Sequence, residues 1–123
     1  MLINSHLFSG DLKMKIEFLH TEDCHVWQKT LPLLKEAMKE DGIKDTIDVF
    51  VIKTQKDAQK HKFSGSPTIK INGEDIDPMA KKVTRYSPAS CRPYFYKGKF
   101  YDYPPKEMIL EALQRAMKTK YLL

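Results

Sequence analysis

The chain lacks the features that define several large classes of protein. It has two cysteines among 123 residues, too few for the disulfide-stapled scaffold of a small secreted protein. Its uncharged apolar runs are short, so no segment has the length of a membrane span. Residues 1–10 carry neither a basic stretch nor a long apolar run, which argues against a signal peptide. We therefore expect a cytoplasmic protein without a membrane partner.

Patterns typical of nucleic-acid and metal sites are also lacking. The formal net charge is +5, and lysines are densest between Lys53 and Lys62. No aromatic or glycine-rich pattern accompanies them, so we interpret this cluster as the solvated face of a helix. Cys24 and His25 are adjacent, which does not match the ligand spacing of a closed zinc site. We predict no metal site, no cofactor and no nucleic-acid partner.

The composition that is present suits one globular domain. Hydrophobic residues make up 41% and charged residues 30% of a chain of common single-domain length. Met14 directly precedes the first predicted strand, so we divide the sequence into an N-terminal extension (1–13) and a domain (14–123). No internal repeat or low-complexity segment interrupts that domain.

Strand and helix patterns alternate along the domain. We predict strands over 15–19, 47–52, 68–71 and 74–77, a loop over 78–90, and a hairpin whose strands cover 92–96 and 99–103. Helices are predicted from Cys24 to the residue before Gly42, over 54–62, and from Pro104 onward. The strand over 47–52 is so rich in apolar residues that we expect it to be buried on both faces. The class is α/β, with a mixed four-stranded sheet, flanking helices and an extra hairpin before the last helix.

Three motifs in order carry a family resemblance. Cys24 opens the segment CHVWQKTLP, residues 65–68 read GSPT, and residues 71–76 read INGEDI. The first resembles the active-site helix of thioredoxins, whose kinking proline corresponds to Pro32. The second resembles their cis-proline loop, and the third the hairpin that follows this loop in glutaredoxins. The chain thus resembles the thioredoxin-like superfamily over residues 15–77 and the last helix, and in particular small stand-alone members that combine GSPT, NGxDIDP and SCR.

This resemblance implies a thioredoxin fold with Cys24 as a nucleophilic thiol opposite a cis peptide at Pro67. A helix N-terminus presents unpaired N–H groups and the positive end of the helix dipole, and both favour a thiolate. The resemblance also implies that Ser66 pairs with a substrate chain in strand fashion. We place His25, Trp27, Ser66 and Pro67 in the substrate-binding site, although core packing is the simpler interpretation of the tryptophan.

The second cysteine of a dithiol enzyme is missing, because Trp27 occupies its position. Cys24 therefore either works as a single thiol or is resolved by another thiol, for which Cys91 is the internal candidate. If residues 74–77 form the fourth strand, the loop that follows begins near Cys24 and brings Cys91 to it. If residues 91–96 form that strand instead, Cys91 lies at the far end of the sheet. We favour the first alternative, which makes Cys24 and Cys91 the predicted catalytic residues.

Two functional hypotheses remain open on the sequence. The first is a thiol–disulfide oxidoreductase with an atypical C-x-x-W motif, which exchanges with a thiol or disulfide of a protein or small molecule. The second is a redox-inactive thioredoxin-like binding module that holds a peptide, a partner protein or a thiophilic metal ion. The missing cysteine leaves open whether the protein is an enzyme.

Overall fold

A computed structural model describes residues 13–88 and 91–121, so the predicted extension lies outside it except for Lys13. The strands are β1 (Ile16–His20), β2 (Ile47–Val51), β3 (Thr68–Ile71), β4 (Glu74–Asp75), β5 (Tyr94–Tyr96) and β6 (Lys99–Tyr101). The helices are α2 (Trp27–Glu40), α3 (Gln55–Lys60), the 3₁₀ helix η1 (Pro78–Lys82) and α4 (Lys106–Tyr121). Within these ranges no helix is long and apolar enough to cross a membrane.

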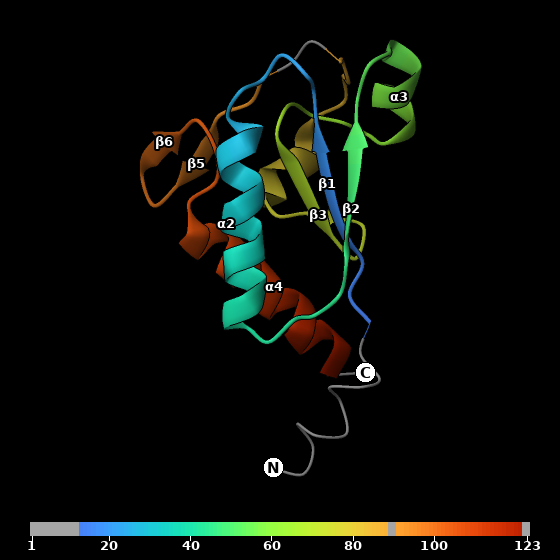
Figure 1. Cartoon of the computed structure of the whole chain (residues 1–123). Helices are drawn as coiled ribbons and strands as arrows, with labels where there is room; N and C mark the ends of the chain where they lie inside the picture. The colour runs from blue at the N-terminus through green and yellow to red at the C-terminus, as the bar shows by residue number, and fades with distance from the viewer. Residues whose placement is uncertain (1–12, 89–90, 122–123) are drawn as a thin grey trace.

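The first four strands form one mixed sheet in the order β2-β1-β3-β4. β1 runs parallel to β2 and antiparallel to β3, and β3 continues into β4 through a tight turn at Asn72 and Gly73. α2 and α4 pack together on one face of the sheet, whereas α3 lies beyond the other (Figure 1). β5 and β6 form a separate hairpin before α4. The α/β class predicted from the sequence is confirmed, including the added hairpin.

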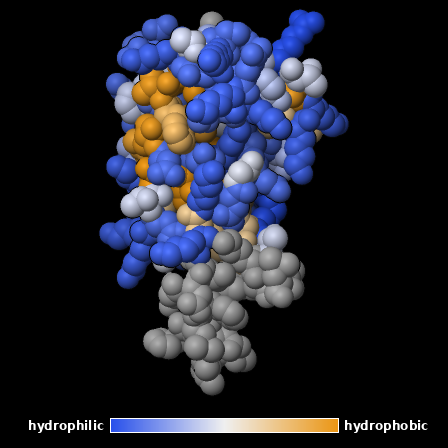
Figure 2. All heavy atoms as spheres, turned by 90° about the vertical axis from the view of Figure 1, so that its right-hand side faces the viewer, coloured by the Kyte–Doolittle hydropathy of each residue, from blue (hydrophilic) through white to orange (hydrophobic). Residues whose placement is uncertain are grey.

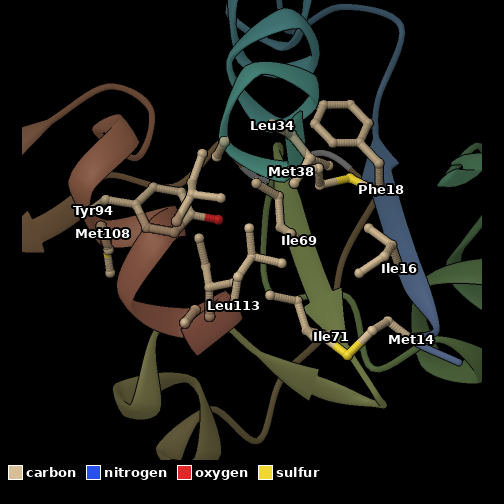
Figure 3. Close-up of a cluster of buried hydrophobic side chains, with 14 residues drawn as sticks. Met14, Ile16, Phe18, Leu34, Met38, Ile69, Ile71, Tyr94, Met108 and Leu113 are labelled. Atoms are coloured by element: carbon tan, nitrogen blue, oxygen red, sulfur yellow. The ribbon is translucent and has the colours of Figure 1, made fainter. Parts of the chain in front are cut away.

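The main core lies between the sheet and the two long helices (Figure 3). Alternate residues of β1 and β3 point toward α2 and α4, as the period of a strand requires. The buried side chains include Ile16, Phe18, Leu34, Met38, Ile69, Ile71, Met108 and Leu113. On the opposite face Leu19 packs with Ala58 and Phe63 in a smaller cluster beside α3. The sheet is therefore covered on both faces in its centre.

β2 differs from its prediction, because it is an edge strand rather than a strand buried on both faces. Val49 and Val51 are 46% and 38% exposed. The sequence pattern was misleading because apolar content does not distinguish a central strand from an edge strand whose outer side chains remain uncovered. Figure 2 shows hydrophobic residues at the surface on this side of the molecule.

The start of α2 also differs from its prediction. The helix begins at Trp27, with Val26 as its N-cap, so Cys24 lies before the helix and not at its first residue. The first helical bonds are accepted by the carbonyls of His25 and Val26. A cysteine is a weak hydrogen-bond acceptor and a poor N-cap, and the thiol of Cys24 is directed elsewhere. Pro32 lies inside the helix as expected.

The region after β3 is more ordered than predicted. β4 ends at Asp75, two residues earlier than expected, and η1 occupies the start of the segment predicted as a loop. Asp77 causes this change, because its carboxylate accepts the N–H of Met79 at 3.0 Å and caps a turn that Pro78 begins.

Replacement of Leu34, which is fully buried in α2, tests the main core. We expect Leu34→Ala to lower the free energy of unfolding by about 2–5 kcal/mol, because it removes apolar contacts and leaves a cavity. The neighbouring exposed residue supplies the control, since Lys35→Ala should change stability by less than about 0.5 kcal/mol. Urea unfolding followed by circular dichroism measures both, and equal effects would contradict the core assignment.

Candidate functional site

A buried loop between α3 and β3 is the centre of the site. The Ser66–Pro67 peptide is cis, as the sequence predicts. Ser66 is fully buried, and its hydroxyl accepts the N–H of Thr21 at 3.1 Å. On the other side of the loop, the hydroxyl of Tyr94 donates to the carbonyl of Pro67. These contacts hold the loop between the end of β1 and the start of β5.

Both cysteines lie against Ser66. Cys24 is buried, and its thiol donates to the carbonyl of Ser66 with an Sγ···O distance of 3.6 Å. Cys91 is exposed and pairs with Ser66 as a neighbour on a parallel chain segment. Both cysteines are free thiols. The chain therefore follows the first of the two predicted courses, in which the segment after β4 returns toward Cys24.

The pKa of Cys91 reflects its place beside Cys24 in one cavity. Although the side chain of Cys91 is exposed overall, partial desolvation raises the pKa of its thiol, and the charge and hydrogen bonding of Cys24 raise it further. The carboxylate of Asp23 adds a smaller effect in the same direction. Each cause disfavours the thiolate of Cys91, so this residue carries its proton at neutral pH.

A cavity of about 430 Å³ opens beside the two thiols. It is bounded by the β1–α2 connection, the cis-proline loop, the segment after residue 90 and the end of the hairpin. Its lining residues are Asp23, Cys24, His25, Val26, Ser66, Cys91, Arg92, Pro93 and Asp102. Of the predicted substrate-binding residues, His25 and Ser66 line this cavity, whereas Pro67 does not.

Trp27 is not among the residues that line this cavity. Its ring stacks on the ring of the buried residue His20, with centroids 4.0 Å apart and an angle of 19° between the planes. Trp27 also packs against the main core. Trp27, at the position where the family resemblance would require a second cysteine, thus has the core-packing role, and its partner His20 was not identified from the sequence.

Arg92 is the residue of the site that the sequence reasoning missed. Its guanidinium makes two hydrogen bonds to Asp75, at 2.7 and 3.1 Å, and lies 3.7 Å from Asp77. It also donates to the hydroxyls of Ser64 and Thr68. The one signal in the sequence was the SCR motif, to which no role was assigned.

Burial and the neighbouring groups have opposite effects on the pKa of this guanidinium. Burial alone would lower the pKa of Arg92, but Tyr94 and the carboxylates of Asp75 and Asp77 outweigh it and raise the pKa. The same burial raises the pKa of Tyr94 far above its usual range, although Arg92 partly opposes this. Arg92 and Tyr94 are thus ionised and neutral, respectively, at neutral pH, and they fix the backbone on both sides of Pro93.

Among the described residues, no group of three or more histidine, cysteine or acidic side chains could hold a metal ion. The structure does bring two free cysteines to one cavity. Thiols so arranged can exchange with disulfides or bind a soft ligand.

The described chain is an α/β protein in which two free thiols meet beside a cis-proline loop. The family model described as a domain of unknown function, DUF2703, matches residues 12–113, and the chain belongs to this family. The match includes both cysteines, the cis-proline loop and Arg92. No curated protein and no solved structure matches the chain significantly.

The ion pair of Arg92 with Asp75 is testable by mutation. We expect Asp75→Ala to lower the free energy of unfolding by about 3–5 kcal/mol, because it leaves a guanidinium buried without its main partner. Glu74 is the matched control, since its side chain is 74% exposed and it pairs with Lys81 only at 4.0 Å. Glu74→Ala should cost less than about 1 kcal/mol in urea unfolding. Equal losses would show that the buried pair is unimportant.

The raised pKa of Cys91 gives a second prediction. Alkylation of Cys91 by iodoacetamide should have its pH midpoint above that of free cysteine, because only the thiolate reacts. Replacing Cys24 with alanine removes a cause of the shift, so the midpoint should move down. Mass spectrometry of peptides over a pH series measures both profiles. An identical profile in the two proteins would contradict the interaction between the thiols.

Proposed function

We propose that the protein is a thiol–disulfide oxidoreductase in which Cys24 and Cys91 alternate between a dithiol and an intramolecular disulfide. The observation that carries this proposal is the position of Ser66. Its carbonyl accepts the thiol of Cys24, and its backbone pairs with Cys91. The resemblance to the thioredoxin-like superfamily supports the same chemistry, with a resolving cysteine that comes from residue 91 instead of residue 27.

The exchange needs a disulfide as its co-reactant. Cys24 loses its proton and attacks one sulfur of the substrate disulfide, whose S–S bond breaks as the bond to Cys24 forms. The first substrate thiolate leaves and takes up a proton. Cys91 then loses its proton and attacks the sulfur of Cys24, which releases the second substrate thiolate. The protein dithiol is oxidised to a disulfide, and the substrate disulfide is reduced to two thiols.

The environment of Cys91 suits the second step. In the free protein, partial desolvation and the neighbouring Cys24 raise the pKa of Cys91 and so favour its protonated form. Once Cys24 has formed the mixed disulfide it can neither ionise nor hydrogen-bond as a thiol, so its contribution to the raised pKa of Cys91 disappears. Cys91 thus becomes easier to ionise at the stage when its thiolate is needed. His25 lines the same cavity, and in its protonated form it would stabilise a leaving thiolate.

Single-cysteine variants test this order of events. With bis(2-hydroxyethyl) disulfide, the wild-type protein should lose the mass of two hydrogens and yield a crosslinked Cys24–Cys91 peptide. Cys91→Ala should stop at a mixed disulfide on Cys24, because its resolving thiol is gone. Cys24→Ala should react with the disulfide at least about tenfold more slowly than the wild-type protein, because Cys91 is held as a thiol. Acid-quenched mass spectrometry of the non-reduced proteins follows all three.

A wild-type protein that accumulates only mixed disulfides, or only dimers linked through Cys24, would refute the dithiol mechanism. A chain whose cysteines resist oxidation altogether would favour the alternative from the sequence, a redox-inactive binding module.

A further inference from the structure

The substrate-pairing position beside the cis-proline loop is occupied by the chain itself. Recognition of an extended polypeptide by strand addition requires free backbone groups on the receiving edge. Here Ser66 pairs with Cys91, and its carbonyl accepts the N–H of Arg92 at 3.3 Å. An incoming polypeptide would have to displace this segment before it could pair with Ser66.

The segment Cys91–Tyr94, which we call the strap, is firmly attached. The guanidinium of Arg92 is held by its two hydrogen bonds to Asp75 and lies 4.2 Å from the ring centroid of Tyr94. Tyr94 is fully buried and bonded to Pro67. The strap also lies close to the cis-proline loop, since a Cβ on Gly65 would lie 2.7 Å from the Cβ of Arg92. Displacing the strap would break a buried ion pair and open this packing, both of which are costly.

The cavity beside the strap remains open to small molecules. Its volume of about 430 Å³ lies within the range of about 300–1,000 Å³ that is usual for small-ligand pockets. Cys24 and Cys91 both line it, so a small disulfide that enters the cavity approaches both cysteines without displacing the strap.

The charge around the cavity favours cations. Asp23 and Asp102 are exposed at its rim, whereas the single guanidinium there is already neutralised by Asp75 and Asp77. The local field therefore attracts positively charged reactants and repels anionic ones.

We propose that the site exchanges with small disulfides, cationic ones above all, and excludes disulfides within extended polypeptides. This inference rests on the proposed thiol–disulfide exchange and specifies its substrate class. The strap pairs with Ser66, the residue predicted to pair with a substrate chain, and it carries Cys91.

Three small disulfides and one peptide disulfide separate the alternatives. The probes are cystamine (cationic), bis(2-hydroxyethyl) disulfide (neutral), dithiodiglycolate (anionic) and a disulfide-linked dimer of a short uncharged peptide with a central cysteine. The rate at which each forms the Cys24–Cys91 disulfide is measured by acid quench and mass spectrometry. Each rate is divided by the rate of the same reagent with the reduced chain unfolded in urea, which removes differences in intrinsic reactivity.

We expect the relative rate of the neutral small disulfide to be at least about tenfold higher than that of the peptide disulfide. Among the small probes the order should be cationic, neutral, anionic. Asp102→Asn should reduce the differences in relative rate among the three small disulfides. Asp48→Asn, at an exposed position on β2 away from the cavity, should leave these differences unchanged. Added salt should also reduce these differences, because it screens the charges at the cavity.

Loosening the strap should admit the peptide. Arg92→Lys keeps the charge but loses the two-point contact with Asp75, so the relative rate of the peptide disulfide should rise. Asp75→Asn should act in the same direction, and circular dichroism checks that each variant folds.

A wild-type protein that reacts with the peptide disulfide as fast as with the neutral small disulfide would overturn this inference, as would the absence of any charge order. Failure to form the Cys24–Cys91 disulfide with every probe would instead refute the proposed function.

Discussion

A guanidinium between two carboxylates connects the sheet to the segment that carries the second thiol. Arg92 makes two hydrogen bonds to Asp75, which belongs to β4, and so binds the strap to the edge of the sheet. Taking these charges out of water is costly, and the bidentate geometry with its hydroxyl partners offsets that cost. The direction of the strap, and with it the position of Cys91, depends on this contact.

The arrangement of the thiols follows from that constraint. Cys24 follows β1 and donates its thiol to the carbonyl of Ser66, while Cys91 pairs with the same serine from a parallel chain segment. Two cysteines distant in sequence therefore meet on a single residue without a C-x-x-C motif. The same pairing occupies the backbone of the loop beside a cavity with two aspartates at its rim, so the proposed resolving role of Cys91 and the proposed choice of substrate rest on one structural feature.

Local patterns allowed much of this to be predicted. The strand over 68–71, the hairpin around Lys97 and Gly98 and the cis peptide at Pro67 follow from alternation, turn residues and motif, and all three are in the structure. The start of α2 and the exposure of Val49 were predicted wrongly, because hydrogen-bond competition at a helix end and a strand's place in the sheet are not local properties. The role of Arg92 was not predicted either, because only the completed fold brings its partner Asp75 near it.

The equilibrium of the reduced chain with glutathione tests most directly whether the strap holds Cys91 against Cys24. Two thiols fixed side by side have a high effective concentration for each other, so the intramolecular disulfide should outcompete glutathione for Cys24. Across a series of glutathione redox buffers, acid-quenched mass spectrometry should find the dithiol and the Cys24–Cys91 disulfide as the main species, with mixed disulfides scarce. Chains that carry glutathione on Cys24, on Cys91 or on both as the main oxidised form would contradict this placement of the two thiols.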